Sequence, residues 1–300
     1  MSDSRHVQGT EGEAVVKEAV KSFYDQVGWQ RISDGRYQNT TYEDLRPVSR
    51  EYIHKCHLRI MRHLKAQGKL LLDAGSGPIQ YVEYLEYSRG YQFRVCADLS
   101  IVALREARHR IGEHGLFVVA DIANLPFKDG CFEGIVSLHT IHHLPIEEHI
   151  HAYREIYRLL DDNANAVVVD GWRHSQLMDI FSPIIKFRNR LAKQRHKSTN
   201  AETSQNLSKP NKDRSEKNSR GTFVEKYNAA WLKKEIERWM HVQIFCWRSV
   251  SVQFLRVFIH PRFGGRQILW LVYWLEERFP QFFGETGQYP IVVVSRIGQE

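Results

Sequence analysis

The residues that most clearly could bind a ligand or take part in chemistry form one short run, in which an acidic residue precedes two glycines. The run follows the apolar segment 70–72 and reads Asp73-Ala74-Gly75-Ser76-Gly77-Pro78. Glycine lets a backbone turn tightly and lets a ligand approach it closely. We expect a helix to begin at Pro78 and to add free N–H groups and the positive end of its dipole. The run therefore predicts a ligand-binding turn between a strand and a helix.

Two nucleotide-binding motifs do not match this turn. A dinucleotide fingerprint requires a third glycine where Gln80 stands, and a P-loop requires Lys and then Ser or Thr after Gly77. Both requirements fail, so a dinucleotide oxidoreductase is disfavoured. We expect a nucleoside ligand without phosphate.

The surrounding sequence predicts the elements that position this turn. Short apolar segments, read as strands, alternate with segments of helical periodicity. The strands are expected at 70–74, 93–97, 116–120, 131–138 and 164–169, and the helices at 78–85, 101–112 and 146–160. Such alternation indicates βαβ units in an α/β fold, with a doubly wound, mostly parallel sheet covered on both faces. We place this core at residues 68–171.

Further elements are expected on both sides of the core. Residues 1–67 should form an N-terminal helical cap, with helices at 12–27 and 48–64. Residues 172–288 should form an acceptor-binding region, and residues 289–300 should hold the final strand. Within that region we expect helices at 177–191, from 223 through 236 and at 265–279, a strand-like stretch at 242–259, and a disordered basic loop at about 197–221.

Four motifs in this order resemble the class I S-adenosylmethionine-dependent methyltransferases, in particular their small-molecule group. They are Asp73 to Gly77, Asp98 after the second strand, Asp121 after the third, and His139-Thr140-Ile141-His142-His143-Leu144 after the fourth. The resemblance covers about residues 70–144. It implies a seven-stranded Rossmann-like sheet and S-adenosylmethionine as the cofactor. Two departures, Pro78 for a common glycine and Glu133 for a common Asp, remove no expected cofactor contact.

The resemblance also implies roles for particular residues. Asp98 would hold both ribose hydroxyls, which suits a carboxylate because it accepts two hydrogen bonds. Asp121 would lie beside the adenine amine. Tyr24 would belong to an N-terminal element that closes over the cofactor, or else would be a helix-end aromatic in the core. The full set of expected cofactor residues is Tyr24, Asp73, Ala74, Gly75, Ser76, Gly77, Asp98, Leu99, Asp121, Ile122 and Leu138.

Candidate catalytic and acceptor-binding residues are fewer. One of His139, His142 and His143 is expected to be the general base, because ligands bind at the carboxyl ends of strands in such sheets. The alternative is that these histidines only cap a loop or pack on the next helix. We expect no metal site, since no carboxylate or cysteine stands at ligand spacing from them. Arg46 would meet the methionine carboxylate or an acidic substrate, or would be solvated or paired locally.

Charge and cysteine content limit the partners. The net charge is +7, yet residues 186–220 hold eleven Lys/Arg and three Asp/Glu, while the rest holds 31 basic and 32 acidic residues. This basic segment is a solvated loop, a tether to phosphate or a membrane surface, or a nucleic-acid contact. The last is disfavoured because no aromatic residue interleaves the charges in the stretch 198–220. The four distant cysteines and the absence of a signal peptide favour a cytoplasmic protein with free thiols.

These observations predict a methyltransferase that acts on a small molecule, such as a sugar, a natural product or a lipid-like intermediate. An O, N or C nucleophile would displace the methyl group in line. The protein would mainly align the reactants and exclude water, with a general base if the nucleophile needs one. An RNA methyltransferase and a non-catalytic cofactor-binding partner subunit are the alternatives. The oligomeric state and the identity of the acceptor are not predicted.

Overall fold

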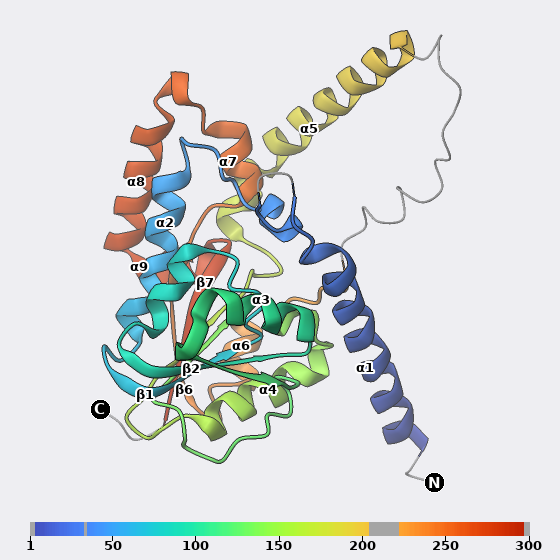
Figure 1. Ribbon diagram of the computed structural model, residues 1–300. Coiled ribbons are helices and arrows are strands. Elements are labelled where there is room, and N and C mark those ends of the chain that lie inside the picture. The colour runs from blue at the N-terminus through green and yellow to red at the C-terminus, as the bar shows by residue number, and fades with distance from the viewer. Residues whose placement is uncertain (1–3, 33–34, 204–221, 297–300) are drawn as a thin grey trace.

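A seven-stranded sheet forms the centre of the computed structural model, which describes residues 4–32, 35–203 and 222–296 (Figure 1). Its order is β3-β2-β1-β4-β5-β7-β6. The strands are β1 (Gly68–Ala74), β2 (Tyr91–Asp98), β3 (Gly115–Val119), β4 (Gly134–Leu138), β5 (Ala166–Val169), β6 (His241–Arg248) and β7 (Tyr289–Ser295). β1 to β5 pair in parallel, and β7 runs antiparallel to β5 and β6. The expected doubly wound, mostly parallel sheet is confirmed.

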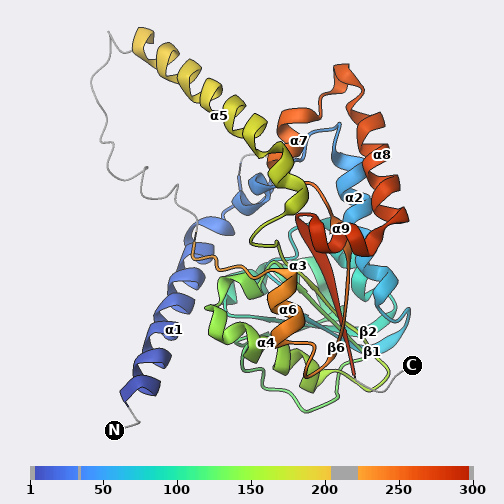
Figure 2. The same cartoon turned by 180° about the vertical axis from the view of Figure 1, so that it is seen from behind.

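Helices cover both faces of the sheet because successive strand residues point to opposite sides. Leu72 and Ala74 of β1 pack with α4 (Ile146–Leu159) and α6 (Ala229–Glu235), which lie in front of the sheet in Figure 2. Leu71 and Cys96 face the other side, where α3 (Ile101–Ile111) and the 3-10 helix 82–88 pack. Two-sided burial explains why β4 and β5 are almost continuously apolar.

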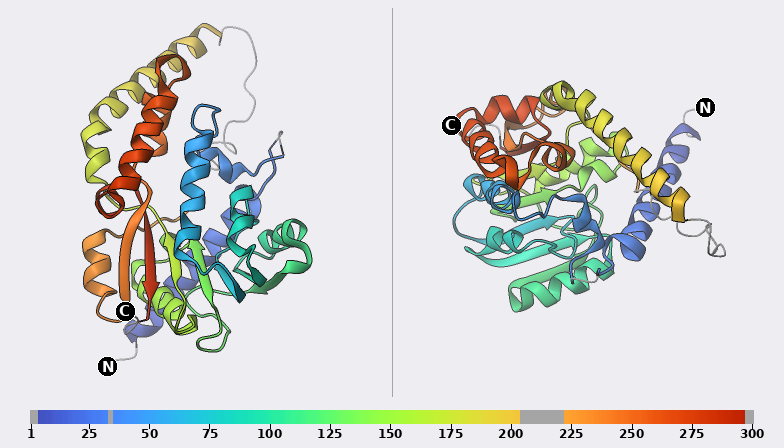
Figure 3. Two further views of the ribbon diagram at one scale, coloured as in Figure 1. Left: turned by 90° about the vertical axis from the view of Figure 1, so that its left-hand side faces the viewer. Right: turned by 90° about the horizontal axis from the view of Figure 1, so that it is seen from above.

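A third apolar cluster joins four helices that stand above the sheet in Figures 1 and 3. They are α2 (Arg50–Leu58), α5 (Gln176–Thr203), α7 (Val252–Phe258) and α8 (Gly265–Arg278). A buried polar group links α2 to α8, because Glu276 accepts from the Tyr52 hydroxyl at 2.7 Å and from Arg59 Nη1 at 2.9 Å. The remaining helices are α1 (Ser4–Phe23), which continues as a π-helical turn at 24–28, and α9 (Pro280–Thr286).

The prediction of a helix that begins at Pro78 is wrong. Residues 78–80 are irregular, and a 3-10 helix begins only at Val82. Ile79 has φ of 56°, a left-handed conformation that ends any helix, and its side chain is fully buried in the core. Proline also disfavours a helical conformation for the residue before it. The glycine turn therefore lies beside irregular backbone instead of a helix N-terminus.

Three expectations for the second half of the chain also need correction. The strand-like stretch 242–259 is β6 followed by α7, whose cap Ser251 accepts from the Phe254 N–H at 3.1 Å. The helix expected from Phe223 begins at Ala229, after an extended segment 222–228. α5 continues to Thr203, so residues 197–203 of the expected basic loop are helical. Residues 204–221 of that loop lie outside the described part of the chain.

Within the described residues, no helix combines the length and the apolar character needed to cross a bilayer.

Candidate active site

The glycine turn after β1 is a place where only glycine fits. Gly75 and Gly77 have φ of 76° and 55°, in the left-handed region. A Cβ at Gly75 would lie 2.2 Å from Thr140 Cγ2, and one at Gly77 would lie 3.1 Å from Trp29 Cη2. The turn is thus pressed between the loop after β4 and the loop after α1. Its backbone forms a wall without side chains, to which a ligand has close access.

Asp98 at the end of β2 is tied to this turn. Its Oδ2 accepts from the Gly77 N–H at 2.9 Å, and its Oδ1 accepts from the Ser100 N–H at 2.8 Å. Burial raises the pKa of Asp98 to about 6, although both backbone hydrogen bonds oppose that rise. The carboxylate and the glycine turn therefore form one preorganised unit.

A cavity of about 530 Å³ lies over the carboxyl ends of β1, β2 and β4. Thirteen of the expected site residues line it: Tyr24, Asp73, Gly75, Ser76, Gly77, Asp98, Leu99, Asp121, Ile122, Leu138, His139, His142 and His143. Ala74 does not line the cavity, because its side chain is fully buried in the core on the α4 side. Asp73 is already engaged by the buried Arg94, whose Nε donates to Asp73 Oδ2 at 3.1 Å.

Arg46 lies outside the residues that line this cavity. Its guanidinium donates to Asp44 at 2.7 and 2.8 Å and to the Leu255 carbonyl at 2.8 Å. Of the expected alternatives, the local ion pair is the one that the structure contains, and Arg46 is removed from the candidate site.

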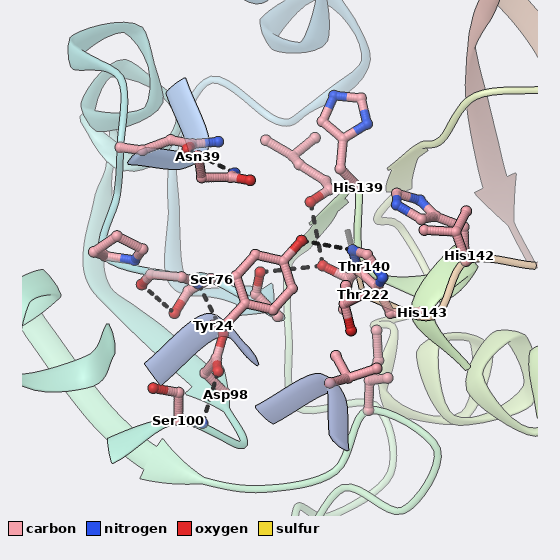
Figure 4. A pocket seen from close by; sticks show the side chains of 18 of the residues that line it. Tyr24, Asn39, Ser76, Asp98, Ser100, His139, Thr140, His142, His143 and Thr222 are labelled. Atoms are coloured by element: carbon pink, nitrogen blue, oxygen red, sulfur yellow. Dashed lines mark hydrogen bonds between the residues drawn. The ribbon is translucent and has the colours of Figure 1, made fainter. Parts of the chain in front are cut away.

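The C-terminal end of α1 and the turn that follows it cover the cavity. Lys17 pairs with Asp121 at 2.5 Å and with Glu148, so it bridges two carboxylates at the cavity wall. Tyr24 stacks on Trp29 with 4.8 Å between ring centroids, and its hydroxyl reaches across to His143 Nε2 at 2.7 Å (Figure 4). Burial raises the pKa of Tyr24, so the phenol stays protonated.

The surroundings of His143 fix its tautomer. Its Nδ1 lies 2.8 Å from the Phe223 carbonyl oxygen, which only accepts, so Nδ1 carries the proton. Burial lowers the pKa of His143 to about 3, so the neutral ring presents an unprotonated Nε2 that accepts from the Tyr24 hydroxyl. Both ring nitrogens are thereby occupied, and His143 has no free nitrogen for a substrate proton.

His142 differs because one ring nitrogen remains free. Its Nδ1 lies 2.5 Å from Asp170 Oδ1, at the end of β5, while Nε2 makes no hydrogen bond to any of the described residues. Burial lowers the pKa of His142 to about 3 and raises that of Asp170 to about 7. A neutral His142 that donates from Nδ1 to Asp170 presents Nε2 as a proton acceptor to the cavity it lines.

His139 has a left-handed backbone conformation, with φ of 56°. Its ring makes an edge contact with Trp247 at 5.2 Å between centroids and another with Tyr289 at 5.9 Å. A left-handed conformation is costly for a residue other than glycine and concentrates at functional sites. His139 therefore stands between the end of the cavity near the cofactor residues and a second end formed by β6 and β7.

Asp170 is the most important site residue that the sequence analysis missed. His139, His142 and Asp170 offer ligand atoms within 4.8 Å of one another. The sequence analysis expected no metal site because no carboxylate stands at ligand spacing from the histidines. That reason is wrong, since the fold brings the Asp170 carboxylate beside them. Residues that line the cavity without having been expected there include Lys17, Glu43, His57, Lys226, Arg248 and Tyr289. They come from elements far apart in the sequence, so no local motif marks them.

Comparison with known proteins agrees with this geometry. A family model described as a methyltransferase domain matches residues 72–168. Probable tRNA methyltransferase 9B is 30% identical over 128 residues in Mus musculus and 27% identical over 157 residues in Homo sapiens. These matches cover 42% and 49% of this chain, but only 27% and 33% of the relatives. The chain therefore spans about a third or less of these curated relatives.

A solved structure shows the same fold. Haemonchus contortus phosphoethanolamine N-methyltransferase 1, in complex with phosphoethanolamine and S-adenosylhomocysteine, gives a TM-score of 0.57 at 9% sequence identity. The superposition covers 98% of this chain and 52% of that one. At this identity the likeness is evidence of fold alone.

The sheet order, the glycine turn tied to Asp98 and the matching family model together define an enzyme class. The chain carries a class I S-adenosylmethionine-dependent methyltransferase domain, and residues 72–168 are its matched part. S-adenosylmethionine is the cofactor of this class. The cavity fits it, because it combines a bare glycine backbone, a carboxylate at the end of β2 and an aromatic cover from Tyr24 and Trp29.

Proposed function

We propose that this enzyme methylates a small-molecule acceptor. The observation that supports this most is a single cavity shared by the glycine turn, Asp98 and His142. Its volume of about 530 Å³ lies within the range of roughly 300–1,000 Å³ that is usual for small-ligand pockets. The cofactor would fill much of this space, so the part of the acceptor inside the cavity must be small.

The cofactor residues have distinct tasks in this proposal. S-adenosylmethionine supplies, when bound, a methyl group already activated by a sulfonium. Asp98 would accept from the ribose hydroxyls, and Asp121, which Lys17 holds by an ion pair, would accept from the adenine amine. Tyr24 and Trp29 close the cavity, and the Tyr24–His143 hydrogen bond holds that cover in place. The chain thus contributes mainly alignment and exclusion of water.

His142 is the proton acceptor in this proposal. Among the three candidate histidines, His143 has both ring nitrogens occupied, and His139 has no polar partner in the described residues to orient its ring. His142 alone is oriented by a carboxylate, through its contact with Asp170. The carboxylate holds the useful tautomer and stabilises the imidazolium that forms after proton transfer. This arrangement suits a hydroxyl or amine nucleophile that must lose a proton.

A tRNA acceptor is the second candidate, and it is favoured by the relatives named tRNA methyltransferase 9B. An RNA nucleotide would have to enter the same cavity, with the phosphates outside on basic side chains. Such binding weakens steeply as salt concentration rises. Strong RNA affinity at low salt that falls on addition of salt, together with methyl transfer to RNA, would replace the small-molecule proposal.

The experiment that tests the proposal begins with the cofactor. Thermal shift and calorimetry with S-adenosylmethionine, S-adenosylhomocysteine, NAD and ATP should give a response to the first two ligands alone. Transfer of a labelled methyl group is then measured against panels of small hydroxyl and amine acceptors and total tRNA. Cofactor binding with no turnover on any acceptor would favour a non-catalytic subunit. We also propose a cytoplasmic location, which rests on the sequence alone.

A further inference from the structure

The end of the cavity formed by α2 and β6 contains several buried polar atoms without partners. Among the described residues, Trp247 Nε1, Arg248 Nε and both ring nitrogens of His57 are buried and make no hydrogen bond. His57 Nδ1 comes no closer than 3.6 Å to Glu83 Oε2. All three residues line the cavity. Buried polar atoms in native proteins are almost always paired, so a group of this size requires an explanation.

These atoms belong to one compact cluster. The rings of His57 and Trp247 stack, with 5.2 Å between centroids and an angle of 11°. The Arg248 guanidinium carbon lies 5.2 Å from the centre of the Trp247 ring. The His139 ring makes an edge contact with Trp247, with 5.2 Å between centroids. The cluster therefore adjoins the histidines beside which the acceptor nucleophile must lie.

The cluster donates hydrogen bonds and has little capacity to accept them. An indole N–H and an arginine Nε–H only donate, and a neutral imidazole donates from one nitrogen. Arg248 Nη1 is already used, because it donates to Glu43 at 2.7 Å. The remaining buried donors of the cluster lack acceptor oxygens.

Two other kinds of ligand group fit poorly here. An ammonium group would seek the aromatic faces, but the Arg248 guanidinium already lies over Tyr289, at 4.6 Å from its ring centre, and over Trp247. An apolar chain would leave every donor buried and unpaired. The neighbouring Lys226 also lines the cavity and makes no ion pair within 4.0 Å among the described residues. Burial lowers its pKa, and an anion nearby would favour its charged form.

We infer that the cluster of His57, Trp247 and Arg248 binds an anionic oxygen group of the methyl acceptor, a carboxylate or a phosphate monoester. This inference rests on the proposed function, and it narrows the acceptor class to anionic small molecules. The anion would anchor the acceptor at one end of the cavity. Its nucleophile would then lie on the far side of His139, beside His142.

The test uses the full chain saturated with S-adenosylhomocysteine. Calorimetric titrations with inorganic phosphate, with acetate and with glucose are compared at an ionic strength held constant with chloride. Binding of phosphate or acetate is expected, and binding of glucose is not. Whichever anion binds more tightly identifies a phosphate or a carboxylate as the anchoring group.

Variants locate the binding. Trp247→Phe keeps an aromatic ring but removes the indole N–H, and it should weaken anion binding by about tenfold, since a charge-assisted hydrogen bond contributes at least one such factor. Arg248→Lys keeps the charge and removes Nε, and it should weaken binding similarly. Trp239→Phe is the matched control, because Trp239 is exposed on the surface beside Arg154. Thermal midpoints confirm that each variant folds.

Two results would overturn the inference. One is the absence of binding by either anion to the saturated protein, and the other is equal binding by all three variants. Affinity for S-adenosylhomocysteine, measured first on each protein, separates this failure from that of the proposed function. If S-adenosylhomocysteine binds and the anions do not, only the anionic acceptor class is rejected.

Discussion

At the scale of single residues, Asp98 links cofactor binding to pH. Burial raises its pKa to about 6, whereas hydrogen bonds from two ribose hydroxyls would favour the charged form and lower that pKa. Binding at pH 6 should therefore release protons to the buffer. Calorimetry in buffers of different ionisation enthalpy measures this release. Asp98→Asn should bind far more weakly and release none. Equal proton release from the variant would show that another group titrates.

The raised pKa of Asp98 also makes the stability of the fold depend on pH. A carboxyl whose folded pKa lies above its unfolded value, about 3.9, stabilises the folded state below pH 4. That contribution is lost as pH rises from about 4 through 6. Asp98→Asn should therefore remove part of the pH dependence of the free energy of unfolding between pH 4 and 6. Urea unfolding of both proteins across this range measures the difference.

His142 and Asp170 give a prediction about rate. His142→Gln and Asp170→Asn should each lower kcat by about 10²–10⁴-fold, which is the usual contribution of general acid–base catalysis. Affinity for S-adenosylhomocysteine should be unchanged. The loss should shrink for acceptors whose nucleophile has a lower pKa, because these need less help to lose a proton. A loss that is equal for all acceptors would indicate a structural role instead.

At the scale of elements, the turn after β1 predicts a selective effect of one added methyl group. Gly75→Ala places a Cβ in left-handed backbone and against Thr140, so it should lower the free energy of unfolding by about 1–3 kcal/mol and weaken cofactor binding. Gly12→Ala is the matched control. Gly12 lies inside α1 with open space around it, and the same change should stabilise by up to about 1 kcal/mol. Chemical denaturation measures both.

The elements also show which parts of the fold could be predicted from sequence. The strands and α3 and α4 were predicted because their apolar residues recur with the period of a buried element. The helix predicted at Pro78 does not form, because Ile79 adopts a left-handed backbone conformation while its side chain is buried in the core. α7 was missed because Ser251, its cap, interrupts an apolar stretch that reads equally well as a strand.

The candidate site was predictable where its contacts are local. Asp98 and the glycines follow predicted strands, so parallel pairing alone brings them together. Asp170 bonds to a histidine 28 residues away, and Trp247 of β6 stacks on His57 of α2, far away along the chain. Such pairs depend on the order of strands and on cap helices. No spacing in the sequence encodes them.

At the scale of the whole molecule, α1 acts as a cover that is held by charge. Lys17 bridges Asp121 and Glu148, and Tyr24 reaches His143. Cofactor in the cavity should therefore slow amide hydrogen exchange in residues 12–28, while α8 stays unchanged as an internal control. Exchange mass spectrometry with and without S-adenosylhomocysteine measures this. Protection confined to the loops after β1 and β2 would show that α1 does not cover the ligand.

The position of β7 between β5 and β6 has a consequence for synthesis on the ribosome. β6 leaves the ribosome before β7, yet within the described sheet its only partner is β7. Until residues 289–295 emerge, β5 and β6 both expose unpaired edges, and the strand that ends beside Asp170 lacks one neighbour. The catalytic end of the sheet is therefore completed only late in the synthesis of the chain. Nascent chains stalled before Tyr289 should recruit chaperones that shield open strands.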